Sequence, residues 1–405
     1  GGGQMMRVRW RVKLGKCVDA SPLIVTRSAS PQHDQSSGCR RSRKTRTVYI
    51  GSHAHRFAAI DLDTGRMYWM TTLNGRIEGS AALSCDGTSV VVGTYGKSIF
   101  TLSASTGSVE WQFDTKGQVK STPVVDGESG MVWCGCHDSH VYGLDLKRKC
   151  CVHRIQLDAP IFSSPALHLP SRLLIVCTLA GTVYALRSSA SASADGDESR
   201  AGGGGEGVGV GGIIWMFRTG LKKPIFSSPA VVHASDCARD GRIIFGCVDA
   251  YVYALNLSGA EVWKCAVGGP VFSSPCLYND SNVKEKEVVI GCHDGNVYCI
   301  RPADGAIVQV HSLSSVPTAA FSTPCMVTDH IIVACASPEG RVCLMDVKVD
   351  VDVDRRSGSC HTKTEGIPPL LSVALPAAVF SSPVVVGMDV VVGCRDDHVY
   401  CITVE

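Results

Sequence analysis

The chain has 405 residues, with 39 lysines and arginines against 37 aspartates and glutamates and a formal net charge of +2. A charge this close to zero gives no overall field that would attract nucleic acid or an anionic membrane, and we expect neither partner. No apolar run reaches transmembrane length, and the opening residues GGGQMMRVRW contain no signal-peptide core. We expect an intracellular protein of the reducing cytoplasm.

Eight similar segments follow one another along the chain, each opened by the phrase FSSP or a variant of it. A repeat of this length predicts a solenoid, a propeller or an array. The opening phrases begin at Asp19 (DASP), Gly79 (GSA), Lys120 (KSTP), Phe162, Phe226 and Phe272 (FSSP), Phe321 (FSTP) and Phe380 (FSSP).

Each segment continues with a short apolar run that ends in Gly-Cys or a related pair, then a polar turn and Val-Tyr-x-Leu. Alternating or continuous Val, Ile, Leu, Tyr and Cys, bounded by Gly, Asp, Asn and Ser, predict short strands and tight hairpins. No stretch has a sustained helical period. The eight copies of this second landmark begin at Gly51, Gly93, Gly135, Cys177, Gly246, Gly291, Ala334 and Gly393.

A third landmark, Thr-Gly-x-x-x-Trp or a relative, places five of the six tryptophans at one repeat position. We assign these side chains a structural role and predict four strands per copy, the last carrying the tryptophan. Four-stranded units arranged radially form a β-propeller, which leaves only short, protected sheet edges. The tryptophans are Trp10, Trp69, Trp111, Trp215 and Trp263; His153, Gln309 and a residue near Leu371 take the position in other copies.

The two ends of the chain complement one another. The chain stops at VYCITVE, after a third strand, and begins with RVRWRV, a tryptophan strand with no blade before it. We therefore expect the strand around Trp10 to complete the last blade. The prediction is an all-β, eight-bladed propeller that forms a single domain over residues 1–405.

Four insertions interrupt the repeat: Arg27 to Arg46, Ser188 to Gly212, Tyr278 to Glu287, and Lys348 to Gly366. Their composition predicts flexible, solvated loops. All four fall in first-to-second or third-to-fourth strand connections, which leave a blade on the same face. We call this the ragged face and the opposite one the tight face.

The first insertion contains a basic run that could serve as a nuclear address or a phosphate patch. A solvated loop is the favoured interpretation. The run consists of Arg40, Arg41, Arg43, Lys44 and Arg46.

Of the twenty cysteines, Cys136, Cys247, Cys292 and Cys394 recur at one repeat position, on different blades too far apart to pair, and Cys177 and Cys335 lie nearby on equivalent strands. They resemble small buried hydrophobic residues, and we expect free thiols. The vicinal pair Cys150-Cys151 follows a turn at a strand start. A redox or metal role for it is disfavoured, because no CxxC pair or histidine at ligand spacing supports one, and we expect no metal site.

The tight face collects the Phe-Ser-Ser phrases and the Cys-His-Asp turns. Hydroxyls around the mouth of the central channel could bond a ligand or cap strand ends. The turn residues could likewise bind a ligand or have a structural role. Structural roles are favoured because Ser before Pro and Asp at a hairpin corner are ordinary turn chemistry, and we expect no catalytic residue. The candidates are Ser21, Thr122, Ser164, Ser228, Ser274, Thr323, Ser382, His137, Asp138, His293 and Asp294, with Asp249 and Asp396 as counterparts.

The blade motif Gly-x-x-Asp-x-x-Val-Tyr-Ala-Leu, followed by Thr-Gly-x-x-x-Trp and Ser-Ser-Pro, resembles the repeat of pyrroloquinoline quinone (PQQ) enzymes. More narrowly, four runs resemble the C-terminal propeller of the beta-alanine-activating enzyme family, also described as acyl-CoA synthetase family members. The resemblance covers nearly the whole chain except the insertions. The runs are LGKCVDASPLIV, GSHAHRFAAIDLDTGRMYW, GCHDSHVYGLDLKRKCCV and VFSSPVVVGMDVVVGCRDDHVYCI.

The resemblance implies a ligase family in which an adenylation domain activates beta-alanine with ATP and a carrier domain holds it as a thioester on phosphopantetheine. No adenylation phosphate loop and no carrier segment is found in this chain, so ATP and phosphopantetheine are assigned to domains outside it. The start on Gly1 rather than Met suggests a fragment. The expected partners are those two domains and an unnamed acceptor or protein.

Three functional hypotheses follow. The favoured one is a non-catalytic recognition platform or scaffold, and a free-standing interaction propeller is an alternative. The other is a quinoprotein dehydrogenase, which would need a calcium site, an aspartate base, an arginine beside the quinone and an aromatic floor. We expect no PQQ, because no unique carboxylate cluster stands out from the repeat and Cys150-Cys151 begins an outer strand.

Overall fold

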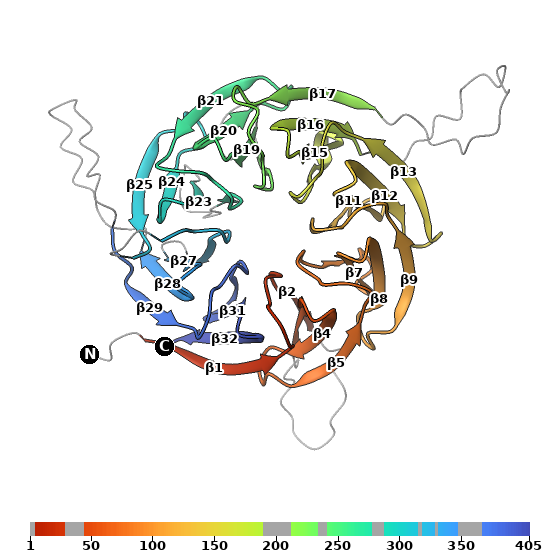
Figure 1. The fold of residues 1–405 in the computed structure, drawn as a ribbon, viewed down its shortest axis with the longest axis vertical. Coiled ribbons are helices and arrows are strands. Elements are labelled where there is room, and N and C mark those ends of the chain that lie inside the picture. The colour runs from red at the N-terminus through yellow and green to blue at the C-terminus, as the bar shows by residue number, and fades with distance from the viewer. Residues whose placement is uncertain are drawn as a thin grey trace, which may run out of the picture.

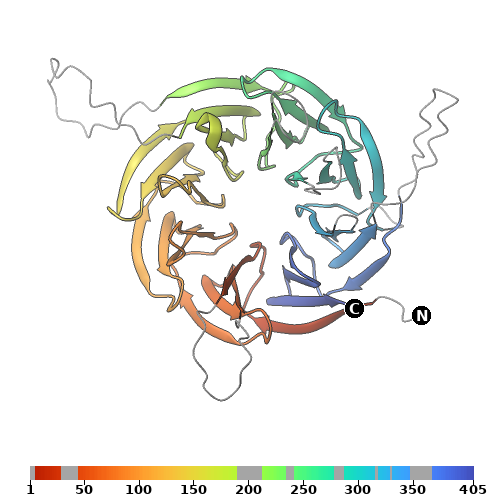
Figure 2. The same cartoon turned by 180° about the vertical axis from the view of Figure 1, so that it is seen from behind.

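The computed structural model describes residues 5–28, 44–188, 212–233, 241–277, 287–314, 318–328, 331–346 and 367–405. In this part, eight antiparallel sheets of four strands each stand around a common axis (Figures 1 and 2). The predicted all-β, eight-bladed propeller is confirmed. A single 3-10 turn, η1 (Leu169–Ser171), is the one helical element in the described residues, where no helix is long and apolar enough to span a membrane.

The first four blades run from inner to outer strand in chain order. The first contains β2 (Leu23–Ser28), β3 (Lys44–Gly51), β4 (Arg56–Asp61) and β5 (Met67–Thr72). The second contains β6 (Ala82–Leu83), β7 (Ser89–Thr94), β8 (Ser98–Ser103) and β9 (Val109–Asp114). The third contains β10 (Val124–Val125), β11 (Met131–Gly135), β12 (His140–Asp145) and β13 (Cys150–Gln156). The fourth contains β14 (Ala166–His168), β15 (Leu173–Cys177), β16 (Thr182–Arg187) and β17 (Ile213–Arg218).

The next three blades keep this order, and the last draws on both ends of the chain. The fifth contains β18 (Ala230–Val232), β19 (Arg242–Gly246), β20 (Tyr251–Leu255) and β21 (Glu261–Ala266). The sixth contains β22 (Cys276–Leu277), β23 (Val288–Gly291), β24 (Asn296–Ile300) and β25 (Ile307–Ser312). The seventh contains β26 (Cys325–Thr328), β27 (Ile331–Ala336), β28 (Arg341–Asp346) and β29 (Leu371–Ala374). The eighth contains β30 (Val384–Val386), β31 (Asp389–Gly393), β32 (His398–Val404) and β1 (Met6–Lys13).

The N-terminal strand completes the eighth blade, as the sequence predicts. Strand β1 pairs antiparallel with β32 from Met6 opposite Val404 to Lys13 opposite His398, with Trp10 opposite Cys401. The two strands lie side by side at the rim of the ring (Figure 1). Backbone bonds between Met5 and Glu405, at 2.8 and 2.9 Å, continue the pairing beyond the strands.

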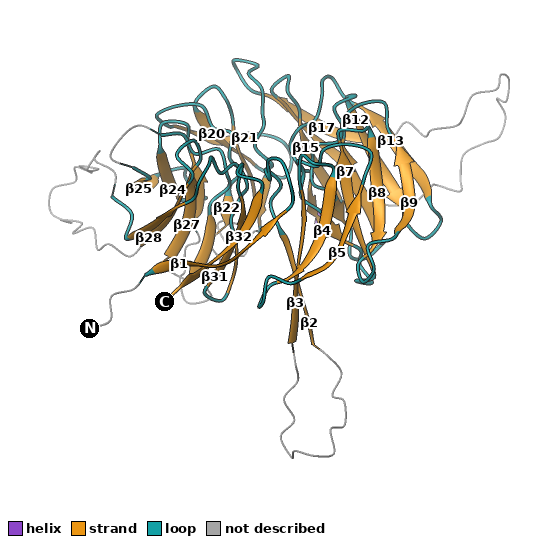
Figure 3. Ribbon diagram, turned by 60° about the horizontal axis from the view of Figure 1, so that its bottom comes forward, coloured by secondary structure: helices purple, strands orange, loops and turns teal. Residues whose placement is uncertain are grey.

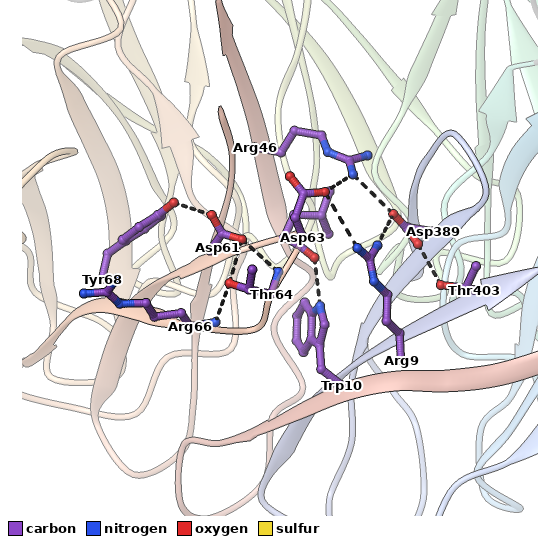
Figure 4. A network of polar contacts seen from close by, with 11 residues as sticks. Arg9, Trp10, Arg46, Asp61, Asp63, Thr64, Arg66, Tyr68, Asp389 and Thr403 are labelled. Atoms are coloured by element: carbon purple, nitrogen blue, oxygen red, sulfur yellow. Dashed lines mark hydrogen bonds and ion pairs between the residues drawn. The ribbon is translucent and has the colours of Figure 1, made fainter. Parts of the chain in front are cut away.

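A network of charged side chains spans the seam where the last blade meets the first (Figure 4). At its centre is Asp389, which is 6% exposed and accepts bonds from Arg9 of β1 (3.0 Å) and Thr403 of β32 (2.8 Å). Arg46 of β3 lies 3.6 Å from the same carboxylate and also pairs with Asp63. The network therefore ties three strands of the last blade to the first blade.

The insertions fall in the predicted connections, on one face of the ring. The flanking strands are β2 and β3, β16 and β17, β22 and β23, and β28 and β29, so each insertion joins first to second or third to fourth strands. Figure 3 shows β2 and β3 extending beyond this face. The central parts of the insertions, among them Arg40, Arg41 and Arg43, lie outside the described residues.

The prediction of a solvated loop from Arg27 to Arg46 is wrong at both of its ends. Arg27 pairs with Thr45, and Ser28 with Lys44, so the first two strands continue into the segment assigned to the loop. The physical reason is local: the backbone pairing continues, and Arg46 has two carboxylate partners at the closure seam.

Each tryptophan of the third landmark packs on a turn of the following blade. Trp10, Trp69, Trp215 and Trp263 donate from Nε1 to a carbonyl of the next third-to-fourth turn at 2.8 to 3.2 Å. A Cβ on the glycine of that turn would lie 2.4 to 2.9 Å from the indole, and the glycine has a positive φ. The glycine of the Thr-Gly motif therefore leaves room for the indole of the preceding blade's tryptophan and adopts the positive φ of the turn.

The blades without this tryptophan are followed by blades that lack the short third-to-fourth turn. The blades of His153 and Gln309 precede the two blades whose third-to-fourth connections carry insertions, and the blade of Leu371 precedes the one closed by β1. Trp111 and Leu146 pack against the same core cluster, and in the turn that follows Leu146 it is Lys149 that has the positive φ, at +53°. The sequence pattern therefore follows the geometry of the next blade.

The hydrophobic core lies between neighbouring blades. One cluster joins Phe57 of the first blade to Val92 of the second, and the other interfaces are built in the same way. The repeated cysteines are part of these cores: Cys136, Cys247 and Cys292 are 0% exposed. The seventeen cysteines in the described residues are unpaired.

We predict that Asp389→Ala weakens closure of the ring. The change leaves Arg9 and Arg46 without their shared carboxylate, and we expect the free energy of unfolding in urea to fall by about 2 kcal/mol or more. The matched control is Glu405→Ala, which removes the exposed ion pair with Arg7 at the same seam and should cost less than about 1 kcal/mol. Equal losses from the two changes would contradict a central role for Asp389.

Candidate binding site at the channel mouth

The first serine of the FSSP phrase is used inside its own blade. Ser273 donates to the carbonyl of Gly291 at 2.8 Å and accepts from its N–H at 2.9 Å, and Ser121 does the same with Gly135 at 2.8 and 3.0 Å. Both serines are buried. This hydroxyl therefore fixes the entry of the inner strand against the end of the second strand.

The second hydroxyl of the phrase links one blade to the next. Its own N–H donates to the hydroxyl oxygen of the equivalent residue on the following blade, at 2.8 to 3.2 Å, in seven successive contacts. We call these eight residues the hydroxyl girdle. They are Ser21, Ser80, Thr122, Ser164, Ser228, Ser274, Thr323 and Ser382.

The predicted hydroxyls do ring the channel mouth, and they cap inter-blade N–H groups there. Seven of the eight oxygens, all except that of Ser80, act as acceptors, and none of the eight donates its hydroxyl proton to a partner among the described residues. Those protons remain free for a ligand. Ligand binding by the girdle stays a prediction.

The girdle surrounds a cavity of about 480 Å³. This volume lies within the range of about 300–1,000 Å³ that is usual for small-molecule sites. Five phenylalanines form one side of the cavity, with neighbouring ring centroids 5.1 to 5.4 Å apart. We call this side the phenylalanine wall; it consists of Phe162, Phe226, Phe272, Phe321 and Phe380.

The other side of the cavity is charged. The phenylalanine position of the repeat holds Asp19 in the first blade, Glu78 in the second and Lys120 in the third. Arg395, from the turn between β31 and β32 of the eighth blade, also lines the cavity. These four residues, which we call the charged arc, lie on four consecutive blades of the closed ring.

Two members of the arc neutralise one another. Arg395 donates to both carboxylate oxygens of Asp19 at 2.7 to 3.2 Å, and its guanidinium lies 3.9 Å from the centroid of Phe380. The bond to Asp19 raises the pKa of Arg395. His53 lies 3.4 Å from Asp19, yet burial lowers the pKa of its imidazole and so disfavours its charged form.

The other two members have no charged partner. Glu78 has a buried carboxylate oxygen, Oε2, without a hydrogen bond, and neither Glu78 nor Lys120 has an ion pair within the described part of the chain. Burial raises the pKa of the Glu78 carboxyl despite the nearby positive charge of Lys120. Burial likewise lowers the pKa of the Lys120 ammonium, which lies 4.9 Å from the Tyr95 ring centroid.

Sequence reasoning missed the charged arc. It grouped the eight opening phrases by what they share, whereas the arc consists of the copies that differ. The signal was available: the residue two positions before each girdle hydroxyl is Phe in five copies and Asp19, Glu78 or Lys120 in the other three. Asp19 and Glu78 are thus two carboxylates that depart from the repeat and that the sequence analysis did not single out.

The predicted turn residues do not line this cavity. Asp138 accepts bonds from Tyr142 (2.8 Å) and the N–H of Lys116 (2.9 Å), and these bonds lower the pKa of its carboxyl although burial opposes them. Asp294 bonds Tyr298 of its own hairpin in the same way as Asp249 and Asp396 bond their tyrosines. These are the contacts of a hairpin corner.

The two predicted histidines differ in their surroundings. His293 packs edge-on against Phe321 of the phenylalanine wall, with centroids 5.1 Å apart. His137 bonds Gln118 through its backbone N–H, and burial lowers the pKa of its imidazole. A ligand-binding role for either histidine stays a prediction.

The site offers binding groups and no metal donor set. Within the described ranges, no three His, Cys, Asp or Glu side chains are placed to hold a metal ion. Burial raises the pKa of the Cys136 thiol to about 11 and that of Cys292 to about 12, so neither is a thiolate nucleophile at neutral pH. Cys150 and Cys151 lie on the outer strand β13 and line no part of the cavity.

The sequence profile described as the β-propeller of the beta-alanine-activating enzyme matches residues 14–404. The chain belongs to this family. The beta-alanine-activating enzyme of Danio rerio is 31% identical over 98% of the chain, and that of Drosophila melanogaster is 24% identical over 98%. The Homo sapiens enzyme is 45% identical over 95 residues, 24% of the chain.

The chain spans about a third of the two relatives that it matches along 98% of its length, 31% of the Danio rerio enzyme and 35% of the Drosophila melanogaster one. Solved structures show the same fold at low identity. The computationally designed Ika8 protein superposes with a TM-score of 0.67 and 13% identity, over 96% of this chain and 97% of its own. BamB from Moraxella catarrhalis has a TM-score of 0.66 and 14% identity, over 98% of both chains.

We predict that Ser228→Ala lowers the free energy of unfolding by about 1 kcal/mol, because the N–H of Ser164 loses its acceptor. The matched control is Ser80→Ala, because the Ser80 hydroxyl accepts no girdle bond in the described structure. This change should lower the free energy of unfolding by less than about 0.5 kcal/mol. Urea denaturation of both variants measures the difference. Identical effects would contradict the structural role of the girdle.

We predict that Glu78→Gln stabilises the protein at neutral pH. A carboxyl whose pKa is raised by folding favours the folded state below its unfolded pKa, near 4.3, and loses that advantage as the pH rises through the folded value. The variant should therefore gain up to about 1 kcal/mol at pH 7.5 and nothing below about pH 4. Thermal melts at the two pH values test this; a loss of stability at pH 7.5 would mean that Glu78 is paired.

Proposed function

We propose that this propeller is a non-catalytic recognition platform of an enzyme that activates beta-alanine. The channel mouth on its tight face receives the acceptor or partner toward which the activated amino acid is directed. The observation that carries the proposal is the pair of charges without an ionic partner, Glu78 and Lys120, in a cavity whose other two charged groups, Asp19 and Arg395, are paired with one another.

Binding suits this cavity better than catalysis. Unpaired, partly buried charges reduce stability, and such groups are characteristic of sites that gain their partners from a ligand. The wall of phenylalanines supplies apolar surface, and the girdle supplies hydroxyl protons. None of these groups forms a nucleophile paired with a base, which a covalent mechanism would require.

The relatives support the place of the platform within a larger enzyme. Their names describe beta-alanine activation, and the chain corresponds to about a third of their length. We assign adenylation with ATP and the phosphopantetheine thioester to adenylation and carrier domains of the longer polypeptide, which are the platform's nearest partners. The free thiols of the described residues suit a reducing, cytoplasmic compartment.

The quinoprotein dehydrogenase hypothesis does not fit the residues present. That enzyme class needs a calcium site of several oxygen ligands, whereas the two acids of the cavity lie on adjacent blades and one of them is bound by Arg395. The described residues contain no group of three suitable donors. We therefore derive no step through PQQ.

The test compares two reactions of the longer enzyme. With Lys120→Glu, we expect beta-alanine thioester formation within twofold of the unaltered enzyme and at least a tenfold loss of transfer to the acceptor in cell extract. The control is Lys264→Glu, an exposed lysine of the outer strand β21, which should change neither reaction.

Deletion of the whole propeller separates recognition from scaffolding. Intact thioester formation with lost transfer supports the platform. Loss of both reactions together with folding would indicate a scaffold and overturn the platform, as would unchanged transfer in Lys120→Glu.

A further inference from the structure

The two partnerless charges of the cavity have opposite signs and lie on neighbouring blades. Glu78 and Lys120 occupy the same repeat position, and each influences the ionisation of the other. They form no ion pair within 4.0 Å in the described structure, whereas Asp19 and Arg395 beside them are fully paired. The cavity thus presents one free negative and one free positive group.

We infer that the channel mouth binds a small zwitterion with an apolar side chain, an amino acid whose ammonium contacts Glu78 and whose carboxylate contacts Lys120. Its side chain lies against the phenylalanine wall. This inference rests on the proposed platform function and names the chemical class of its ligand.

The charge balance of the arc selects a zwitterion over a simple ion. Asp19 and Arg395 cancel, and Arg76, which acts on both Glu78 and Lys120, lies over the Tyr95 ring and does not line the cavity. Of the charges that line the cavity, one negative and one positive group therefore remain for a ligand that carries both signs. A lone anion would pair with Lys120 and be repelled by Glu78. A lone cation would pair with Glu78 and be repelled by Lys120. Partly buried charges without partners are costly, and a zwitterion supplies both partners at once.

The rest of the cavity matches the two ends of such a ligand. The girdle hydroxyls keep their protons available to the oxygens of a carboxylate, which prefers several donors. The phenylalanine wall faces the charged arc and offers apolar surface to a side chain. Aromatic rings also tolerate a nearby ammonium, as the position of Lys120 5.6 Å from the Phe162 centroid shows.

The experiment uses four probes that differ in one element each, titrated calorimetrically into the 405-residue chain. L-Phenylalanine has both charges and an apolar side chain; 3-phenylpropionate lacks the ammonium, 2-phenylethylamine lacks the carboxylate, and glycine lacks the side chain. We expect L-phenylalanine to bind at least tenfold more tightly than each of the other three.

Variants then assign each contact. Glu78→Gln should weaken L-phenylalanine at least tenfold and leave 3-phenylpropionate unchanged or tighter. Lys120→Met should weaken L-phenylalanine and 3-phenylpropionate and leave 2-phenylethylamine unchanged. The controls Glu261→Gln and Lys264→Met, at exposed positions of β21, should stay within twofold for every probe.

Three results would overturn the inference: no binding of L-phenylalanine at millimolar concentration, equal affinity for the four probes, or a Glu78→Gln variant that unfolds. The first would favour a protein segment as the occupant of the channel. If these titrations fail while Lys120→Glu still abolishes acceptor transfer, the platform stands without this ligand. If they succeed and transfer is unaffected, the ligand site stands and the platform falls.

Discussion

The ring depends on one repeated contact, in which an N–H of each inner strand donates to the hydroxyl of the next blade. Seven such bonds pass from Ser80 round to Ser21, and in the described structure the eighth, from Ser21 back to Ser80, is not formed. Asp19 and Glu78 lie at that step. The series of N–H to hydroxyl bonds is therefore interrupted between the first and second blades, where charged side chains line the cavity.

The same logic of neighbouring blades explains the outer rim. A tryptophan occurs where the following blade offers a turn with a positive-φ glycine, as Trp215 meets Gly259. His153 and Gln309 replace it where the following connection carries an insertion. The residue at the tryptophan position of one blade thus depends on the turn of the next blade. This dependence accounts for the replacements His153 and Gln309, which the repeat pattern alone does not explain.

The blade count, the closing strand and the channel-mouth hydroxyls could be predicted because they depend on periodicity, which a sequence displays directly. The ends of the first insertion could not, because Arg46 is held by Asp63 and Asp389 from distant parts of the chain. The charged arc was visible as three exceptions at the phenylalanine position. That Asp19 is paired while Glu78 is not depends on Arg395, brought beside Asp19 only by closure of the ring.

The central claim is that the departures from the repeat at the channel mouth form a ligand site. The most direct measurement is the anomalous difference map of crystals grown with 4-bromo-L-phenylalanine, in which the bromine marks the side chain. The account predicts one strong peak in the cavity on the side of the phenylalanine wall, opposite Glu78 and Lys120. A cavity without a peak, or a peak confined to the ragged face or the outer strands, would contradict it.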